Sequence, residues 1–338
     1  MGRKKLEPGI SMKVVGNMAG VSAMTVSRAL KNPSSVSEAV LQRIQAVIDK
    51  IGYVPNRVAG SLSSNRTTHV ALVVPSLRTA IHAEMIQGIS DILRQHGFQL
   101  MISDCGNSLE LEEAQIRAYV AQRVCGLILH NTRHSEAALR ILANAGIPCV
   151  ETGDLNKSPI DSVVSYSNHA AGAAMAAHFI AAGYKRMAFV SLHVKNRDRI
   201  GALRKGFVAA LRRAGLPIAP ELLLEVGAGM ESGAKALSLI LETAPATQAI
   251  FFAGDVLAAG AVFECQRRGI RIPSQIAIAN SDDSELLQNT VPKVTSIHYP
   301  RYDIGVRAAQ IVVDRAREAG GQPVVQDIGF TVLRRAST

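Results

Sequence analysis

From residue 69 to residue 281 the chain alternates short apolar runs with amphipathic stretches, and this alternation constrains the fold more than any other feature. Three of the runs are 69-HVALVV-74, 126-GLILH-130 and 249-AIFFAG-254. Each is apolar almost throughout, instead of at every second position, which is typical of parallel strands covered by helices on both faces. About nine such runs precede residue 285, too many for one small sheet, so the pattern predicts an α/β core with two doubly wound parallel-sheet halves.

Ahead of this core, the stretch 21-VSAMTVSRAL-30 predicts a short helix. Ser22 is a typical N-cap residue, and helical spacing places one apolar stripe inward, made of Val26, Ala29 and Leu30. The same spacing leaves five side chains facing outward: Ala23, Met24, Thr25, Ser27 and Arg28.

Another short helix is predicted over 11-SMKVVGNM-18, followed by a turn at Gly20. Two short helices joined by a glycine turn indicate either a helix-turn-helix or an ordinary helical hairpin, and this stretch alone favours neither. A third amphipathic helix, predicted over residues 34–53 with Ser37 as a cap, would complete a minimal core. In the first helix we expect three side chains to face that core: Val14, Val15 and Met18.

Charge separates the two interpretations. Residues 1–66 hold 10 Lys and Arg against 3 Asp and Glu, which is +7 of the chain's net +10. The other 272 residues hold 27 basic and 24 acidic side chains, only +3. A basic head on a nearly neutral body indicates a polyanionic partner, so we predict that the helix pair binds DNA.

The composition, 48% hydrophobic and 19% charged over 338 residues, is that of a soluble globular chain with a sizeable core. No apolar stretch is long enough to span a membrane, and the opening MGRKKLEPGISMK lacks the apolar segment of a secretory signal. We therefore expect a cytoplasmic protein with no membrane partner. The four cysteines are widely spaced without a CxxC pair, which predicts buried, reduced thiols.

An enzyme is one alternative. The segment 227-GAGMESG-233 follows a predicted strand as a dinucleotide-binding loop would, but its GxGxxxG spacing is one residue longer than that fingerprint. We interpret it as a plain strand-to-helix turn. The GxxxxGK[ST], GxSxG and HExxH motifs are absent, and the nine histidines lack metal-ligand spacing. We expect no cofactor and no metal.

Polar side chains near predicted strand ends are candidates for a ligand crevice, because the carboxyl ends of parallel strands face it. Asp282 and Asp283 follow the run 276-IAIANS-281 and suit either acid catalysis or binding of sugar hydroxyls, of which binding needs fewer assumptions. His82 and His130 either line the same crevice or are ordinary structural histidines.

Three segments together resemble the lactose-repressor (LacI/GalR) family of bacterial transcription regulators: AGVSAMTVSRAL, VSEAVLQRIQAVIDKIGYVPNRVAGSL and VALVVPSL. The resemblance continues through 285-ELLQNTVPKVTSI-297 and covers nearly the whole chain. It implies a helix-turn-helix head, a hinge helix and a core similar to periplasmic sugar-binding proteins, in which two α/β subdomains close over a small ligand.

The resemblance also implies domain boundaries. The head would span residues 1–54, the hinge 55–66 and the effector-binding and dimerisation core 67–338. Within the core we expect a first subdomain of about 67–160 with 284–297, and a second of about 163–282 with 298–338. Three chain crossings between them are expected near 152–164, 281–285 and 290–300.

Residues of the head and hinge match those that contact DNA in this family. Met24 offers apolar contact to a thymine methyl, whereas Arg28 has the donors for a bidentate contact with guanine. Leu62 matches a hinge leucine that wedges into the minor groove of bent DNA. The full DNA-binding set is Ser22, Ala23, Met24, Thr25, Ser27, Arg28, Asn56, Arg57, Ala59 and Leu62.

Within the family, 24-MTVSRALKNPSSVS-37 and 263-FECQRRG-269 look most like the gluconate-repressor subgroup. That implies a sugar acid effector such as gluconate or ketogluconate. Arg199 and Arg204 lie near a predicted helix start, where they either hold a carboxylate or are simply solvated. The expected effector-binding set is Ser76, Arg78, His82, His130, Tyr166, Arg199, Arg204, Asp255 and Asp282.

The chain departs from the family pattern at several positions. Val14 stands where an acid is usual, and Gly16 replaces the usual alanine, which should weaken the first helix by about 0.5–1 kcal/mol. Ser167 stands where an Asp is common. Arg78 and His82 occupy a region where an Asn-Pro-aromatic sequence is usual, so the effector need not be gluconate itself.

Taken together, these features predict a homodimeric repressor that binds a palindromic double-stranded DNA operator and is controlled by a sugar acid. By analogy with the family, the effector is expected to act as an inducer by closing the cleft and misaligning the hinge helices. Two alternatives share the core: a solute-binding protein of transport type, which would need an export signal and no basic head, and a sugar-acid enzyme, which would stay active without residues 1–66.

Overall fold

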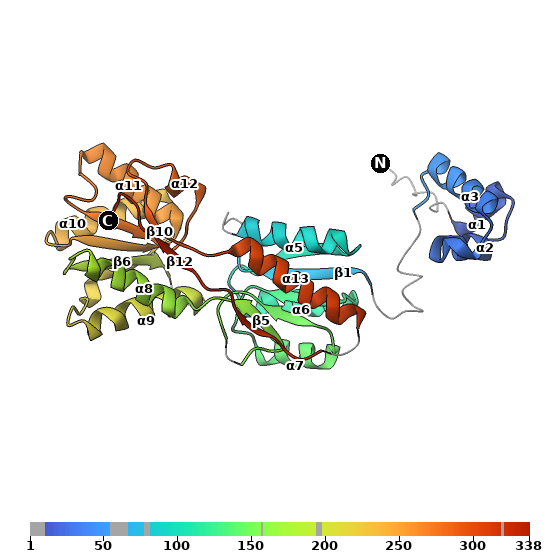
Figure 1. The fold of residues 1–338 in the computed structure, drawn as a ribbon, viewed down its shortest axis with the longest axis horizontal. Coiled ribbons are helices and arrows are strands. Elements are labelled where there is room, and N and C mark those ends of the chain that lie inside the picture. Colours follow the sequence, from blue (N-terminus) through green and yellow to red (C-terminus); the bar gives the residue numbers. More distant parts are fainter. Residues whose placement is uncertain (1–10, 55–66, 78–81, 157, 194–197, 319–320) are drawn as a thin grey trace, which may run out of the picture. The chain divides into compact units, whose positions relative to one another are not determined.

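A computed structural model describes residues 11–54, 67–77, 82–156, 158–193, 198–318 and 321–338 (Figure 1). The chain divides into two compact units, residues 1–66 and residues 67–338. The candidate hinge residues Asn56, Arg57, Ala59 and Leu62 lie outside the described residues, as does Arg78. Within the described part, none of the helices combines the length and apolar character that crossing a lipid bilayer requires.

The first unit contains the three predicted helices. The helix pair is confirmed, with Gly20 in the left-handed conformation (φ 67°) in the turn between the first two helices. A short 3-10 turn, η1 (Pro33–Ser35), leads into the third helix. The helices are α1 (Met12–Ala19), α2 (Ala23–Lys31) and α3 (Glu38–Ile51). Their small core is formed by Val15, Ala19, Val26, Ala29, Ile44 and Tyr53.

The prediction of which α1 side chains face the core is only partly right. Val15 is fully buried, but Val14 is 43% exposed and Met18 is 49% exposed. Ala19, four residues after Val15, takes the buried place instead. Neighbouring positions on a helix are rotated by about 100°, so a stripe centred on Val15 and Ala19 turns Val14 and Met18 towards solvent.

Packing explains why glycine stands at position 16, which helix propensity does not reveal. Its backbone carbonyl accepts a hydrogen bond of 2.9 Å from the Val21 amide, which draws α1 against the turn. A Cβ atom at position 16 would lie 2.7 Å from the Val21 carbonyl oxygen and 3.2 Å from the Ala23 nitrogen. Glycine is therefore what allows this close approach.

The second unit is the predicted α/β core with two six-stranded sheets (Figure 1). In the first sheet all strands are parallel, in the order β11-β5-β4-β3-β1-β2. Its strands are β1 (His69–Val74), β2 (Gln99–Asp104), β3 (Gly126–Leu129), β4 (Cys149–Glu151), β5 (Ser162–Ser165) and β11 (Val325–Asp327). The helices packed with it are α5 (Ala83–Gln95), α6 (Leu109–Ala121), α7 (Glu136–Ala145) and α13 (Arg301–Arg317).

The second sheet has the order β12-β10-β9-β8-β6-β7, in which only the pair β10–β12 is antiparallel. Its strands are β6 (Met187–Leu192), β7 (Leu223–Val226), β8 (Ala249–Ala253), β9 (Ala277–Asn280), β10 (Thr295–His298) and β12 (Thr331–Leu333). Its helices are α8 (Asn168–Ala181), α9 (Asp198–Arg213), α10 (Met230–Thr243), α11 (Asp255–Arg268), α12 (Glu285–Gln288) and the 3-10 turn η3 (Pro220–Leu222).

The expected subdomain boundaries need correction. β10 pairs with β9 in the second sheet, so residues 284–297 do not belong to the first subdomain, and no crossing lies at 281–285. β11 pairs with β5 and α13 packs on α5, so both belong to the first subdomain. The chain crosses between β5 and α8, between β10 and α13, and between β11 and β12. Strand pairing, not order along the chain, decides the boundaries.

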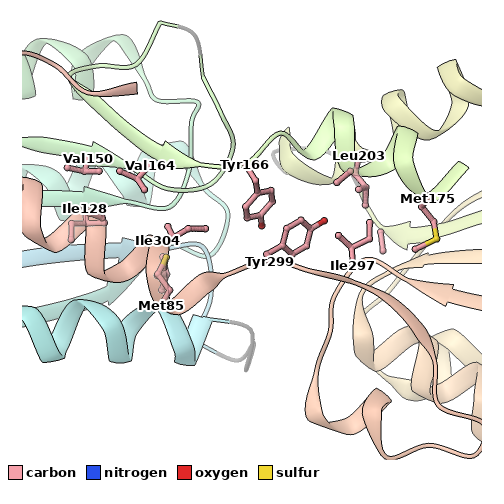
Figure 2. Packing of buried hydrophobic residues seen from close by; sticks show 14 of the residues in the cluster. Met85, Ile128, Val150, Val164, Tyr166, Met175, Leu203, Ile297, Tyr299 and Ile304 are labelled. Carbon is pink, nitrogen blue, oxygen red and sulfur yellow. The ribbon is translucent and has the colours of Figure 1, made fainter. Parts of the chain in front are cut away.

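Apolar packing fills both halves. In the second half, Phe179, Phe189, Phe207 and Phe251 are fully buried, and their ring centroids lie 5.2–6.2 Å apart. Figure 2 shows part of the same cluster, from Met85 in the first half to Met175 in the second. The cysteines are buried free thiols, as predicted: Cys105, Cys125, Cys149 and Cys265.

Candidate functional site

The surface of α2 carries the candidate DNA-reading residues. The Ser22 hydroxyl caps the helix by accepting a hydrogen bond of 3.1 Å from the Thr25 amide, which confirms the predicted N-cap. The Ser22 and Thr25 hydroxyls are also 2.9 Å apart. Met24 is 81% exposed and Arg28 is exposed, whereas Ala23, Thr25 and Ser27 are half-buried. Among the described residues no carboxylate pairs with Arg28, so its guanidinium is free for another acceptor.

The core holds a cavity of about 530 Å³ between the two sheets. Its walls come from segments that follow the carboxyl ends of strands in both halves, as expected for parallel sheets. Of the nine expected effector residues, six line this cavity: Ser76, His82, Tyr166, Arg199, Asp255 and Asp282. Arg204 and His130 do not, and Arg78 lies outside the described residues.

Arg204 is held on the surface instead. Its guanidinium donates to Glu225 at 2.7 Å, and the two side chains are 29% and 30% exposed. Arg204 lies five positions after Arg199, a separation that turns its side chain away from the face of α9 that meets the cavity. Arg204 therefore does not line the cavity in this arrangement.

His130 stands behind His82. The two rings meet edge to face with centroids 4.6 Å apart, and the His130 Nδ1 lies 3.0 Å from the Thr152 hydroxyl. Burial, together with the guanidiniums of Arg199 and Arg301, lowers the pKa of His82 to about 3. Burial likewise lowers the pKa of His130 well below its usual value. Both imidazoles are therefore neutral at neutral pH.

Arg199 lies against the backbone of Gly153, which follows β4. A Cβ atom at position 153 would come within 1.9 Å of the His130 carbonyl oxygen and 3.2 Å of the Arg199 Cδ. The Asn168 amide donates to the Gly153 carbonyl at 3.0 Å and fixes this segment at the first crossing. No carboxylate among the described residues forms an ion pair with Arg199, so its charge is available to a ligand.

Asp282 is already engaged. Arg301, the first residue of α13, forms an ion pair with it, and the Ser281 hydroxyl donates to its other oxygen at 2.7 Å. The Arg301 guanidinium also stacks over Tyr299, with its central carbon 4.9 Å from the ring centroid. The carboxylate of Asp282 is therefore less available to a ligand than its position after β9 indicates.

Asp255 differs from Asp282 because no cation holds it. It begins α11, its side chain accepts from the Val256 amide at 2.9 Å, and it is 8% exposed. Burial, followed by the nearby carboxylate of Asp282, raises the pKa of Asp255. Among the described residues, no Arg, Lys or His forms an ion pair with it.

The three chain crossings meet beside the cavity through aromatic rings. Tyr166 at the first crossing stacks on Tyr299 at the second, with centroids 3.9 Å apart, and both rings stand between the two halves (Figure 2). Phe330 at the third crossing packs against Tyr299, with ring centroids 6.4 Å apart. Each crossing thus contributes one ring to a single cluster.

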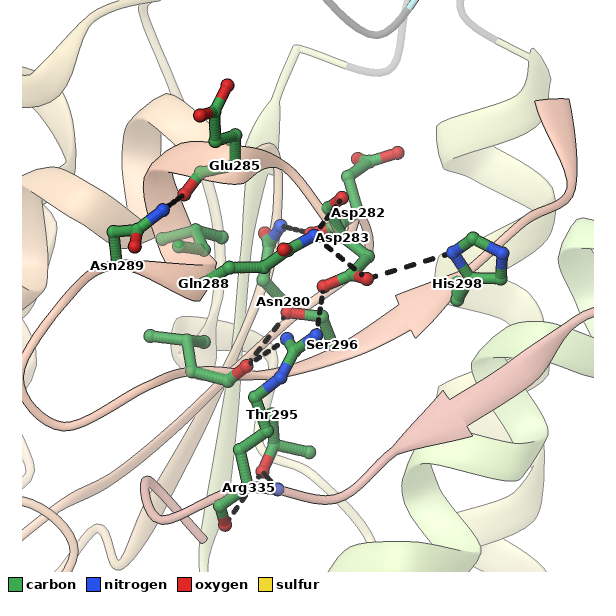
Figure 3. A network of polar contacts seen from close by, with 12 residues as sticks. Asn280, Asp282, Asp283, Glu285, Gln288, Asn289, Thr295, Ser296, His298 and Arg335 are labelled. Carbon is green, nitrogen blue, oxygen red and sulfur yellow. Dashed lines mark hydrogen bonds and ion pairs between the residues drawn. The ribbon is translucent and has the colours of Figure 1, made fainter. Parts of the chain in front are cut away.

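A polar network holds the segment that carries Asp282 (Figure 3). Arg335, near the end of the chain, forms an ion pair of 2.6 Å with Asp283, and the His298 ring lies 3.7 Å from the same carboxylate. Arg335 also donates to the Val294 carbonyl at 2.7 Å. The candidate acid Asp283 is therefore a structural anchor.

On the other side of the cavity, a buried ion network supports the wall formed by residues 131–133. The His134 Nδ1 lies 2.8 Å from Glu112, and its Nε2 lies 3.5 Å from Glu151. Burial alone would lower the pKa of His134, but the two glutamates outweigh it and raise that pKa to about 9. The Asn131 amide donates to Glu112 at 3.0 Å and ties the wall to this network.

Several residues of the site escaped sequence analysis: Asn131, Arg133, Gly153, Tyr299 and Arg301. All of them follow the carboxyl end of a strand or lie at a crossing. The strand-end rule would have included them, but the sequence does not reveal which strand ends converge.

Comparisons with known proteins agree with this architecture. The profile of the bacterial regulatory proteins of the lacI family matches residues 11–56. A periplasmic binding protein-like domain matches residues 176–338.

Full-length relatives are similar over nearly the whole chain. The transcriptional regulator GntR of Escherichia coli is 32% identical over 318 residues, which is 94% of this chain and 95% of the relative. GntR of Pseudomonas aeruginosa is 33% identical over 329 residues, 97% of this chain and 95% of the relative. A crystal structure of a LacI family regulator from Silicibacter pomeroyi superposes with a TM-score of 0.91 at 31% identity, covering 97% of this chain and 99% of that one.

These matches join the helix-turn-helix head and the two-sheet core in one chain. A solute-binding protein of transport type does not account for the head, and regulators of this kind are not enzymes. The chain belongs to the lacI family of bacterial regulatory proteins and is a DNA-binding transcriptional regulator.

Proposed function

We propose that this regulator is a homodimeric repressor that leaves a palindromic operator when a sugar acid with one carboxylate binds in the core cavity. The observation that carries the proposal is the polarity of the cavity. Both Arg199 and Asp255 line it, and among the described residues Arg199 has no carboxylate as an ion-pair partner and Asp255 has no cation.

The cationic side suits the acid group of the ligand. Arg199 and Arg133 line the cavity, and Arg301, which is not part of its lining, neutralises the lining carboxylate of Asp282. His82 and His130 add no charge at neutral pH, and Arg199 keeps a positive charge that no ion pair among the described residues takes up. An arginine fork facing a sheltered cavity is a good partner for a carboxylate.

The acidic side suits hydroxyl groups. A carboxylate accepts hydrogen bonds from sugar hydroxyls without needing a charge on the ligand. A cavity of about 530 Å³ lies within the usual range for small-ligand sites. A polyhydroxy acid, with its carboxylate on Arg199 and a hydroxyl on Asp255, satisfies both sides, in agreement with the resemblance to gluconate repressors.

The head supports the rest of the proposal. Met24 and Arg28 are exposed on α2, which supports a role in reading base edges, and two heads related by a twofold axis would read two half-sites. Such a regulator would act in the cytoplasm, where the operator DNA lies. The hinge residues Asn56, Arg57, Ala59 and Leu62 complete the proposed DNA contacts.

Thermal unfolding of the full chain with gluconate, 2-ketogluconate and glucose tests the effector class. A ligand at 100 times its Kd stabilises by about 2.7 kcal/mol, which should raise Tm by about 5–10 °C. The expected result is a shift with an acid that disappears in Arg199→Ala and persists in Arg204→Ala, which removes a guanidinium of the same helix outside the cavity. A shift with glucose alone would overturn the sugar-acid proposal and leave the DNA-binding function intact.

A further inference from the structure

Asp255 has an unusual environment for a buried carboxylate, and this environment bears on ligands with two acid groups. Asp255 is 8% exposed, and its carboxylate accepts a hydrogen bond from the Val256 amide in the first turn of its own helix. The other side chains with full charges that line the cavity are Asp198 and Arg199 at the start of α9, Arg133 after β3, and Asp282, which is already paired with Arg301. None of the described cations forms an ion pair with Asp255.

A second carboxylate on the ligand would have to approach this group. Arg199 and Asp255 line the same cavity, so a six-carbon diacid held by Arg199 at one end carries its second acid group into the space that Asp255 also lines. Two carboxylates that face each other in a sheltered site cannot both stay ionised, and such a pair holds one proton between them.

We propose that Asp255 makes recognition of the effector depend on its charge: a sugar acid with one carboxylate binds without a proton, whereas a sugar diacid binds only together with one proton that it shares with Asp255. The inference rests on the proposed function, because it assumes that the first acid group lies on Arg199. It adds a rule of selectivity against diacids that weakens as the pH falls.

Other groups in the cavity are poorly placed to take this proton. Asp282 is neutralised by Arg301 and bonded to Ser281. His82 is flanked by Arg199 and Arg301, which oppose a further positive charge. The pKa of Asp255, in contrast, is raised by burial and by Asp282 even before a ligand arrives.

The test is isothermal titration calorimetry of the full chain with D-gluconate and with D-glucarate, which carries a carboxylate at each end, between pH 5.5 and 8. Two buffers with different ionisation enthalpies report the number of protons taken up. For gluconate we expect a Kd that changes less than about threefold over this range. For glucarate we expect uptake of close to one proton and a Kd that falls up to about tenfold for each unit that the pH falls.

Two variants decide whether Asp255 is responsible. Asp255→Asn is expected to abolish the proton uptake with glucarate and to bind it at least about tenfold more tightly than the unmodified protein at pH 8. Glu285→Gln removes an exposed acid of the same subdomain outside the cavity, and it should keep the proton uptake.

Glucarate binding without proton uptake, or with uptake that persists in Asp255→Asn, would overturn the inference and leave the proposed function standing. If glucarate does not bind the unmodified protein at any pH, a gain of binding in Asp255→Asn supports the inference and no gain overturns it. Failure of gluconate and 2-ketogluconate to bind, with glucose binding instead, would overturn the proposed function and this inference with it.

Discussion

The proposed DNA-reading surface of α2 and the candidate ligand cavity of the core hold their polar groups in opposite ways. On α2, Met24 and Arg28 project from consecutive turns of one short helix and have no side-chain partner among the described residues. In the cavity, Asp282 and Asn168 are bonded before any ligand arrives, by groups distant in the sequence. A surface that reads DNA needs only local spacing, whereas a cavity that encloses a small ligand depends on segments brought together by the whole fold.

We expect the largest effect on the cavity from a substitution at Gly153. Gly153→Ala would place a Cβ atom 1.9 Å from the His130 carbonyl oxygen, so the segment under Arg199 must move. We expect a loss of about 3 kcal/mol or more in the free energy of unfolding of the core, and at least about a hundredfold weaker effector binding. Chemical unfolding and calorimetry of the full chain measure the two effects.

The matched control is Gly201→Ala, on α9 two residues after Arg199. No atom lies within 4 Å of a Cβ built at position 201, so this change should stabilise the helix by about 0.5–1 kcal/mol. Equal behaviour of the two variants would show that the close approach at Gly153 does not support the cavity.

The buried wall network makes the core, and not the head, sensitive to alkali. His134 has a usual pKa of 6.5, raised in the folded protein to about 9 by Glu112 and Glu151. Because the folded-state pKa is the higher one, the stabilisation is complete below pH 6.5 and is lost as the pH rises through 9, by up to about 3 kcal/mol. Unfolding by urea between pH 6 and 10 measures the loss.

In His134→Gln the stability of the core should be lower at pH 6 and should change little between pH 6.5 and 9. The melting of the head, which lacks this network, should not follow the same pH profile. Unchanged stability of the unmodified core between pH 6 and 10 would contradict a charged His134.

A variant at Arg28 tests the proposed DNA-reading surface. Arg28→Ala should weaken operator binding by about 1–3 kcal/mol, with the loss confined to particular base pairs. A binding assay against operators with single base-pair changes measures this, and Lys31→Ala, on the same helix, is the control. If Arg28→Ala weakens binding uniformly across the sequences, Arg28 contacts a phosphate instead.

The smallest effect is expected at the start of α2. Ser22→Ala removes the hydroxyl that accepts from the Thr25 amide and should lower the stability of the helix by about 1 kcal/mol. Ser37 is the N-cap residue of α3 but makes no side-chain capping bond, so Ser37→Ala should cost less. Native-state hydrogen exchange on the full chain measures both, and a larger loss at Ser37 would contradict the capping geometry.

The same contrast explains which predictions succeeded. The helices of the head follow from spacing within a few residues, so the α2 stripe and the Ser22 cap were predicted correctly. Val14 and Met18 were misplaced because the face of α1 that becomes buried is chosen by its contacts with other helices. Gly16 was judged by helix propensity alone, although its packing against Val21 is a contact across the turn.

The apolar runs predicted the two-sheet class of the core, but they did not predict which sheet each of the last strands joins. Nothing in the local sequence of β10 or β11 states which sheet it joins: β11 pairs with β5, more than 100 residues earlier, whereas β10 pairs with the strands next to it in the chain, β9 and β12. The same limit applies to the site. Arg199 and Arg204 look alike in the sequence, and only the position of Glu225 shows that Arg204 is occupied elsewhere.

The third crossing has a consequence for how this chain is made. The first sheet receives its edge strand β11 and its covering helix α13 from residues 301–327, and the second sheet receives β12 from residues 331–333. A ribosome must therefore synthesise almost the entire chain before either half can complete its sheet. The two halves cannot finish folding one after the other during translation, because the first sheet waits for residues 325–327 and the second for residues 331–333.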